Sequence, residues 1–157
     1  MHITSRARYG LRAMLYLAMR GEGRQVPLSE IAVAEGIPGP FLERVVAGLR
    51  AAGLVTATRG VTGGYRLARP PAEITAADVV QALEGSLELL ACVHDGDACR
   101  RSRSCLSRRV WARLDEAIAG ALAGVTLREL VAEQRLATAA AGDAHAGGAG
   151  AGRADEA

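Results

Sequence analysis

Three cysteines, the only ones in the chain, lie within one short polar segment, Cys92-VHDGDA-Cys99-RRSRS-Cys105. The segment has few apolar side chains, so its thiols are not expected to belong to a hydrophobic core. An odd number of cysteines would leave one thiol over in a closed disulfide framework. Thiolates spaced along a loop are typical ligands of zinc and of iron–sulfur clusters. Residues 92–105, which we call the cysteine loop, therefore predict a soft-metal site.

Length and composition predict one domain with an appended element. The chain has 157 residues, half of them apolar but only 3% aromatic, so its core must be built from Leu, Val, Ile and Ala. Its apolar runs fall well short of the roughly 18 residues that a membrane helix needs. The N-terminus, MHITSRARYG, resembles neither a signal sequence nor a transit peptide. We therefore expect a cytoplasmic protein without membrane partners, in a compartment that keeps thiols reduced.

Charge is distributed unevenly along the chain. Residues 1–70 contain ten arginines and four acidic residues, a net charge of +6, whereas residues 71–157 carry −4. Every basic residue is arginine, whose bidentate guanidinium suits phosphate and guanine. The first half is therefore the expected polyanion-binding half.

The basic half has the pattern of a helix-turn-helix followed by a hairpin. A first helix is capped at Thr4 or Ser5, and a short second helix covers 28–35. A turn at Gly36-Ile37-Pro38 leads into a third helix that ends near Gly53. Two β-rich runs then flank a glycine-rich connection, as in the wing of a winged helix.

The second half is predicted to be helical around the cysteine loop. Thr75 and Asp78 have capping-box spacing at the start of a fourth helix, and Thr126 with Glu129 opens a last helix through Leu136. The fold class is therefore mainly α, a winged helix-turn-helix with a two-stranded wing and a long C-terminal dimerisation helix. The expected divisions are a DNA-binding domain (1–70), a connecting helix (71–91), the cysteine loop (92–105), the dimerisation and terminal helices (106–137) and a disordered tail (138–157).

The third helix and the hairpin supply candidate DNA contacts. Glu43 could accept from a cytosine amino group, Arg44 could reach phosphate or guanine, and Arg59 is placed to enter a minor groove. Small residues at the wing tip suit close approach of the backbone to DNA. The full set of predicted DNA-binding residues is Pro40, Glu43, Arg44, Arg59, Gly63, Gly64 and Arg66.

A long helix predicted from Leu106 to Leu122 carries an apolar stripe that the small winged-helix core cannot cover. A second subunit would cover it, which predicts a homodimer on a pseudo-palindromic double-stranded DNA operator. The predicted interface residues are Val110, Trp111, Leu114, Ile118 and Leu122.

Several segments together resemble the IscR/NsrR/RirA family of bacterial iron–sulfur winged-helix regulators. They are TSRARYGLRAML, VPLSEIAVAEGIPGPFLERVVAGLRAAGLV, TRGVTGGYRLARP and CLSRRVWARLDEAIAGALAGVTLRELV. The resemblance covers about residues 1–134. It implies a homodimer formed through the long helix, a cluster held by the three cysteines, and base contacts from Glu43 and Arg59.

The chain departs from that family at the fourth ligand. IscR-type proteins have a histidine three residues after the last cysteine, where this chain has Arg108, and a guanidinium does not ligate iron. NsrR-type proteins can use an acid near the N-terminus, a region that here contains Arg8. His94 or His2 could be the fourth ligand, or three thiolates could hold a cubane without one. The missing imidazole favours [4Fe–4S] over [2Fe–2S].

Taken together, these features predict a DNA-binding transcriptional regulator whose affinity is gated by a cluster that senses nitric oxide, redox state or iron and cluster status. The alternative is a zinc- or thiol-based DNA-binding regulator without a cluster, because three cysteines and His94 would satisfy tetrahedral zinc. An enzyme is not expected, since the chain lacks a Cys-x-x-Cys pair and a nucleotide-binding loop. Arg100, Arg101 and Arg103, within the loop, would favour a reduced cluster, or else are solvated or contact DNA phosphates.

Overall fold

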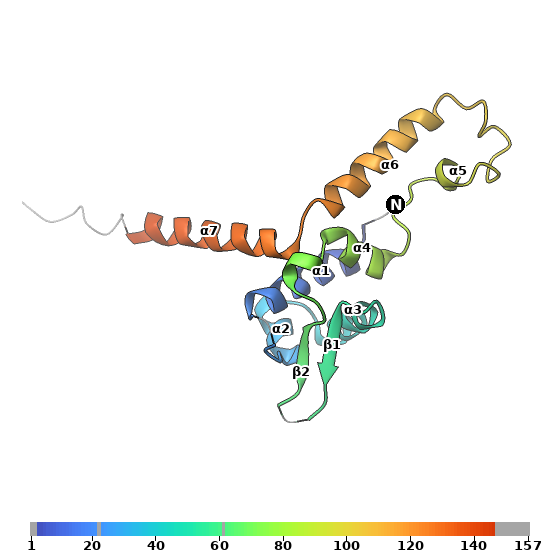
Figure 1. Ribbon diagram of the computed structural model, residues 1–157. Coiled ribbons are helices and arrows are strands. Elements are labelled where there is room, and N and C mark those ends of the chain that lie inside the picture. The colour runs from blue at the N-terminus through green and yellow to red at the C-terminus, as the bar shows by residue number, and fades with distance from the viewer. Residues whose placement is uncertain (1–2, 22, 61, 147–157) are drawn as a thin grey trace, which may run out of the picture.

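The computed structural model describes residues 3–21, 23–60 and 62–146. Figure 1 shows α1 to α4 gathered beside the hairpin, while α6 and α7 extend from this body in different directions. The elements in chain order are α1 (Ser5–Met19), α2 (Leu28–Glu35), α3 (Gly39–Ala51), β1 (Val55–Thr58), β2 (Gly64–Leu67), the 3-10 helix η1 (Pro71–Glu73), α4 (Ala76–Glu84), α5 (Ala91–His94), α6 (Arg108–Ala123) and α7 (Leu127–Ala146).

A tight turn between α2 and α3 creates the helix-turn-helix. Gly36 ends α2 with a φ of +59°, a left-handed conformation that a residue without a Cβ adopts at little cost. The backbone N–H of buried Ile37 then donates to the carbonyl of Ala32 at 2.9 Å. Pro40 lies in the first turn of α3, where its missing N–H would have had no helical partner. The predicted second and third helices are confirmed.

The hairpin is anchored on the segment that precedes α2. β1 and β2 are antiparallel, with Val55 opposite Leu67 and Thr58 opposite Gly64. On the other side of β2, the N–H of Val26 donates to the carbonyl of Tyr65 at 2.9 Å, and the Tyr65 N–H donates back at 2.8 Å. The predicted hairpin is confirmed, and this third pairing holds it against the helix-turn-helix.

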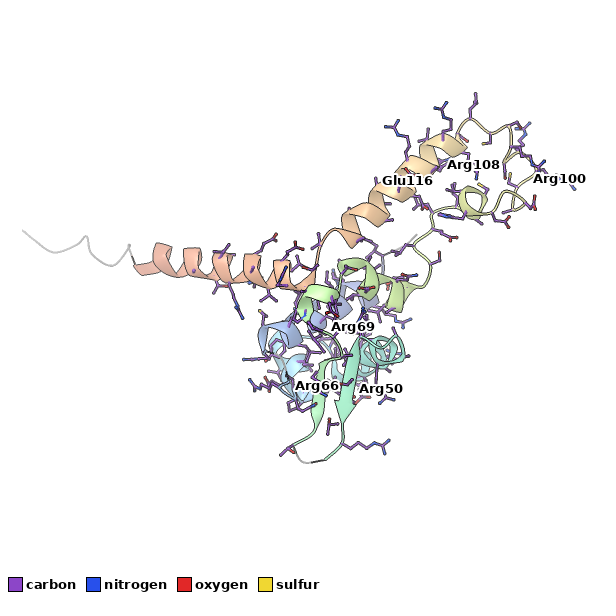
Figure 2. All side chains as sticks on the ribbon, in the orientation of Figure 1. Arg50, Arg66, Arg69, Arg100, Arg108 and Glu116 are labelled. Carbon is purple, nitrogen blue, oxygen red and sulfur yellow. The ribbon has the colours of Figure 1, made fainter. Side chains whose placement is uncertain are left out.

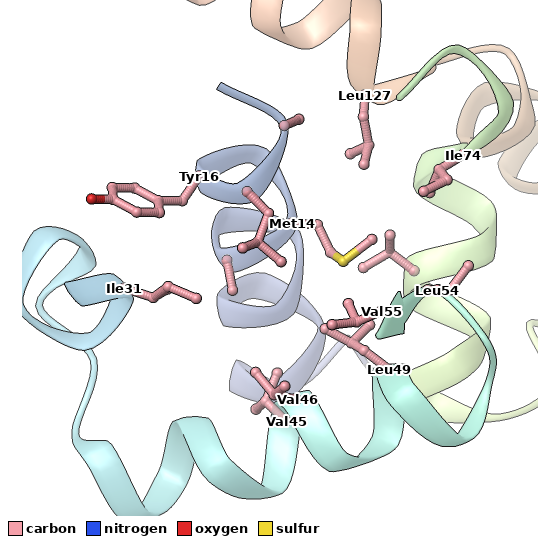
Figure 3. Packing of buried hydrophobic residues seen from close by; sticks show 14 of the residues in the cluster. Met14, Tyr16, Ile31, Val45, Val46, Leu49, Leu54, Val55, Ile74 and Leu127 are labelled. Atoms are coloured by element: carbon pink, nitrogen blue, oxygen red, sulfur yellow. The ribbon is translucent and has the colours of Figure 1, made fainter. Parts of the chain in front are cut away.

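Aliphatic side chains form the core, as the low aromatic content predicts. Figure 3 shows Met14 of α1 packed among side chains from α3, β1 and the later helices. The largest fully buried side chains are Met14, Ile31, Leu42, Leu49, Ile74, Leu127, Val26, Val45, Val46, Val55 and Val79. The core therefore unites the winged helix with the first turn of α7.

Two capping boxes join α4 and α7 to the body. Both bonds of the predicted Thr75–Asp78 box are present, and the Thr126 N–H donates to the Glu129 carboxylate at 2.8 Å. The two caps lie side by side, because the Ala76 N–H donates to the Val125 carbonyl and the Leu127 N–H to the Ile74 carbonyl, each at 2.9 Å. Residues after the cysteine loop therefore return to the winged-helix body.

The last helix is longer than predicted. α7 continues past Leu136 to Ala146, so residues 138–146 are helical, where a disordered tail was expected. This stretch has no apolar periodicity, but it is rich in alanine, which has the highest helix propensity. Residues 147–157 of the predicted tail lie outside the described residues. Within the described part of the chain, none of the helices has the length and apolar character needed to cross a bilayer.

A carboxylate from α4 caps the start of α1. Glu84 accepts hydrogen bonds from the Thr4 hydroxyl at 2.6 Å and from the backbone N–H groups of Thr4 and Ala7, each at 3.2 Å. Burial by itself would raise the pKa of Glu84, but these hydrogen bonds outweigh it and the pKa lies below its usual value. The ionised carboxylate is therefore the form that stabilises the fold.

Because the pKa of Glu84 is depressed on folding, its contribution is present above the unfolded value of about 4.3 and is lost as pH falls through the folded value. We expect Glu84→Gln to lower the free energy of unfolding at pH 7 by about 0.5–1 kcal/mol, and the difference from wild type to shrink below about pH 4. Urea unfolding across this range measures it, with exposed Glu88→Gln as the control. A difference that does not change with pH would contradict the assignment.

Candidate DNA interface and cysteine loop

The predicted DNA contacts of α3 lie on its outward face. Pro40, Glu43 and Arg44 are exposed in its first two turns, while Leu42 and Val45 of the same helix are buried. Among the described residues, Glu43 and Arg44 take part in no ion pair. Their charged groups are therefore available to a ligand.

The hairpin carries two further exposed arginines. Arg59 follows β1 directly and is exposed, and Arg66 on β2 is exposed with its Nε donating to the Thr56 hydroxyl at 3.2 Å. Figure 2 shows Arg66 and Arg50 on the body at the hairpin end of the molecule. The structure thus brings the helix and hairpin candidates into one half of the molecule.

Gly63 and Gly64 have a structural reason to be glycine. A Cβ on Gly64 would lie 2.6 Å from the carbonyl carbon and oxygen of Val26, and one on Gly63 would lie 2.3 Å from the Thr58 carbonyl oxygen. Both contacts are with backbone, which cannot move aside without breaking the hairpin pairing. Their predicted role in DNA binding stays a prediction, beside this packing role.

A stack of aromatic and guanidinium groups, which the sequence reasoning missed, links α1 to α3. The Tyr9 and Phe41 rings meet edge to face with centroids 5.5 Å apart. Arg8 lies over Tyr9 at 5.0 Å and Arg44 over Phe41 at 5.7 Å. The stack holds Arg44 on the outer face of α3 and has Arg8 of α1 at its other end. The available signal was an aromatic with an arginine on the same helix, directly before it in Arg8-Tyr9 and three residues after it in Phe41 and Arg44.

The cysteine loop connects α5 to α6. Cys92 lies on α5 and is half-buried, Cys99 is exposed, and Cys105 is half-buried two residues before the cap of α6. Buried Ser102 folds the middle of the loop, because its hydroxyl donates to the Cys99 carbonyl at 2.7 Å. All three thiols are free.

The donor chemistry suits a soft metal centre, but the described conformation does not assemble it. Within the described residues, no three His, Cys, Asp or Glu side chains lie close enough together to hold one metal ion. The Ser107 hydroxyl, 3.1 Å from the Cys105 sulfur, and then the Arg108 backbone N–H lower the pKa of the Cys105 thiol. A thiolate is the form that binds metal and attacks electrophiles.

The candidate fourth ligands are not arranged as such. The His94 Nε2 pairs with the carboxylate of Asp115 on α6. His2 lies outside the described residues. Arg108 donates from Nε to the Cys92 carbonyl at 2.8 Å and from Nη2 to the Val93 carbonyl at 2.7 Å. The arginine at the position of the IscR-type histidine is therefore a backbone brace in this chain.

The loop arginines do not share a surface with the predicted DNA contacts. Figure 1 shows the hairpin and the cysteine loop at opposite ends of the molecule, and Figure 2 places Arg100 at the loop end. The alternative of phosphate contacts by Arg100, Arg101 and Arg103 stays a prediction.

α6 has the reverse of the usual burial pattern. Its one buried residue is Asp115, whereas Leu106 just before it is 81% exposed and, within it, Val110, Trp111 and Leu114 are 62%, 41% and 43% exposed. Ile118 and Leu122, the remaining predicted interface residues, are half-buried. An amphipathic helix usually buries its apolar stripe against the protein, so the exposed stripe of α6 is a candidate interaction surface.

A helix-turn-helix with an attached wing and an arginine-bearing outer face defines a winged-helix DNA-binding protein. The model of the Rrf2 family, described as iron-dependent transcriptional regulators, matches residues 3–133. The chain belongs to this family and is a transcriptional regulator rather than an enzyme.

Individual relatives agree with this assignment. The HTH-type transcriptional regulator IscR of Aliivibrio salmonicida is 36% identical over 136 residues, which cover 87% of this chain and 80% of that protein. Protein rrf2 of Nitratidesulfovibrio vulgaris is 37% identical over 136 residues, 87% of this chain and 91% of its own.

Solved structures share the fold. CymR, the global cysteine regulator of B. subtilis, superposes with a TM-score of 0.71 at 32% identity, covering 85% of this chain and 98% of its own. T. potens IscR superposes with a TM-score of 0.69 at 32% identity, covering 85% of this chain and 88% of its own. The mainly helical winged-helix architecture predicted from the sequence is confirmed.

Proposed function

We propose that this regulator is a cytoplasmic homodimer whose affinity for a pseudo-palindromic operator depends on an iron–sulfur cluster held by Cys92, Cys99 and Cys105. The observation that carries the proposal is the position of three free thiols in one loop that leads directly into α6. α6 also carries the exposed apolar stripe that a second subunit would cover. A change in the loop would therefore act on the element that sets the spacing of the two DNA-binding units.

DNA recognition is assigned to the outer face of α3 and to the hairpin. Glu43 would accept from a cytosine amino group in the major groove, while Arg59 would enter the adjacent minor groove. Arg44, Arg66 and Arg8 would neutralise phosphates, which fixes orientation and supplies much of the affinity. Pairing through α6 would present two such faces to two half-sites.

The cluster is proposed to be [4Fe–4S] with three protein thiolates. Of the two candidate fourth ligands, His94 pairs with Asp115 and His2 lies outside the described residues, while Arg108, at the position of the IscR-type histidine, braces α5 and does not ligate iron. When bound, the cluster would supply a centre that responds to nitric oxide, redox state or iron supply. The lowered pKa of Cys105 favours the thiolate that such a centre requires.

The chain's own residues would convert loop order into DNA affinity. Closing the loop brings exposed Cys99 toward half-buried Cys92 and Cys105, which lie at its two ends. Cys105 precedes the first turn of α6, where the Arg108 and Arg109 N–H groups bond back to the carbonyls of Cys105 and Leu106, each at 3.3 Å. Movement of the loop would thus shift the start of α6, and shifts of a few ångströms suffice to spoil a match to two half-sites.

A cluster-free thiol or zinc regulator is the second candidate. The lowered pKa and partial exposure of Cys105 suit a reactive thiol as well as a ligand. Among the similar solved structures is an oxidised form of Staphylococcus aureus CymR. In this chain the thiol chemistry would act through the same loop and the same helix.

Anaerobic purification, a visible spectrum and iron and sulfide analysis test the proposal. We expect a single broad violet–blue band with about four irons per chain. Removal of the cluster should change operator affinity at least about tenfold, a difference in binding free energy of about 1.4 kcal/mol. Cys92→Ala, Cys99→Ala and Cys105→Ala should each abolish this change, while exposed Ser104→Ala in the same loop should retain it.

The outcomes separate the candidates. Resolved bands with about two irons would replace the cubane with [2Fe–2S]. A colourless protein that contains zinc, or whose DNA affinity changes only on thiol oxidation, would overturn the cluster and support the second candidate. Both candidates would be overturned if DNA affinity in all three cysteine variants still changed as it does in wild type.

A further inference from the structure

Helix α6 is joined to the segment 89–94 by hydrogen bonds that involve no cysteine side chain. Two come from the guanidinium of Arg108, which donates to the carbonyls of Cys92 and Val93 at 2.8 and 2.7 Å. These carbonyls belong to the four-residue helix α5, too short to hold itself together. The planar fork of arginine can bond both acceptors at once, which a lysine ammonium on a flexible stem does less well.

Asp115, nearly two turns further along α6, supplies the other connection. Its Oδ1 accepts from the Leu89 backbone N–H at 2.8 Å, and its Oδ2 pairs with the His94 imidazole. The residue is only 8% exposed, although it is charged. A buried carboxylate is retained only where it is well hydrogen-bonded, so both partners are required at this position.

We propose that Arg108 and Asp115 are positioning residues that form a clasp between α6 and residues 89–94, fixing Cys92 relative to the start of α6 before any metal binds. This inference rests on the proposed cluster function of the same loop. Cys92 and Cys105 lie at the two ends of the loop, next to this clasp, whereas exposed Cys99 lies between them and would approach them when the loop closes. Arg108 thus acts on the site through the backbone of a ligand and not as a ligand.

The clasp has two consequences for the cluster. Because the clasp already holds the two ends of the loop together, the loop loses less conformational entropy when it closes around iron. Partners outside the ligand set commonly change metal affinity by about 10–100-fold when they are removed. The same set of hydrogen bonds keeps His94 paired with Asp115, so its imidazole is not free to serve as the fourth ligand.

Amide hydrogen exchange of the metal-free protein tests the clasp without reference to the cluster. In Asp115→Ala the Leu89 amide should exchange at least about tenfold faster than in wild type, because its charged acceptor is gone. In Arg108→Lys the Asp95 amide, which bonds to the Ala91 carbonyl at 2.8 Å and closes α5, should accelerate by a similar factor. The Val26 amide in the hairpin anchor is the internal reference for the folded body.

Matched variants control for charge and for folding. Glu116→Ala removes an exposed carboxylate from the next position of α6, and Arg109→Lys repeats the arginine change at an exposed neighbour. Neither should alter exchange at Leu89 or Asp95. If Asp115→Ala does not fold, Asp115→Asn keeps the shape, and it should still accelerate Leu89 exchange because a neutral amide is a weaker acceptor.

Cluster loading provides the second readout. Arg108→Lys and Arg108→Gln should bind the same number of irons as wild type and lose them to a chelator about 10–100-fold faster. Wild-type exchange and chelation rates in all clasp variants would overturn the inference. Protected Leu89 and Asp95 amides in a wild-type protein that never takes up iron would instead overturn the cluster proposal and leave the clasp standing.

Discussion

Replacing both Val110 and Leu114 with glutamate is expected to make the regulator monomeric and to weaken operator binding by on the order of 10²–10⁴-fold. Both side chains project from α6 with large exposed fractions, and neither contributes to the core of its own subunit. Two carboxylates buried against a second subunit would be costly, and in an isologous C2 interface both subunits carry the same two substitutions. Operator binding weakens because each monomer binds one half-site alone, without the second, intramolecular contact that a dimer makes.

Sedimentation equilibrium and fluorescence anisotropy on one- and two-half-site duplexes measure this effect. Gly120→Glu introduces the same side chain on another face of α6, where an added Cβ meets no atom within 4 Å, and should remain dimeric. Thermal unfolding should change little in either variant, because α6 adds no apolar residue to the core. A double variant that still sediments as a dimer would place the interface elsewhere.

Arg59→Ala is expected to cause the second large loss. An arginine that reads base edges or groove shape contributes about 1–3 kcal/mol to discrimination, so a dimer with two altered wings should lose about 2–6 kcal/mol on its operator. Arg59 is exposed directly after β1, and the Val26–Tyr65 pairing that positions the hairpin involves none of its atoms. The variant should therefore keep its fold.

The measurement is affinity for operator and for a scrambled duplex at several salt concentrations. A base-reading role predicts a larger loss on the operator than on the scrambled sequence. Arg135→Ala on α7 removes the same charge from an exposed site on a different element and should change both affinities little. Equal losses on both duplexes, with a salt dependence reduced by about one phosphate per wing, would show that Arg59 contacts only the backbone.

Elements with local end signals were predictable from the sequence. α2 occupies the predicted residues 28–35 because its ends depend on Pro27 and Gly36, and α4 begins at the predicted capping box of Thr75 and Asp78. Such signals involve residues three or four apart and act before any tertiary contact forms. The alanine-rich end of α7 was missed because its helicity comes from propensity alone, without the periodicity that was sought.

The candidate site likewise has features that the sequence predicts and contacts that only packing creates. The types of the three cysteines and of Glu43 and Arg59 were readable from the sequence, as was their order along the chain. The stack that joins Arg8 to Arg44 was not, because Tyr9 and Phe41 come from separate helices that packing brings together. Likewise, nothing local to Asp115 marks it as the buried residue of an otherwise exposed helix.

The sequence by itself determined that this protein is a winged-helix regulator with a thiol-bearing loop, because caps, apolar periods and motif order are properties of neighbouring residues. Only the tertiary structure decided what Arg108, His94 and Asp115 do. Their partners lie 15 to 26 residues away, and a hydrogen bond over that distance exists only after α5 and α6 have been placed side by side. Side-chain type limits which bonds can form, and the packing of the helices selects among them.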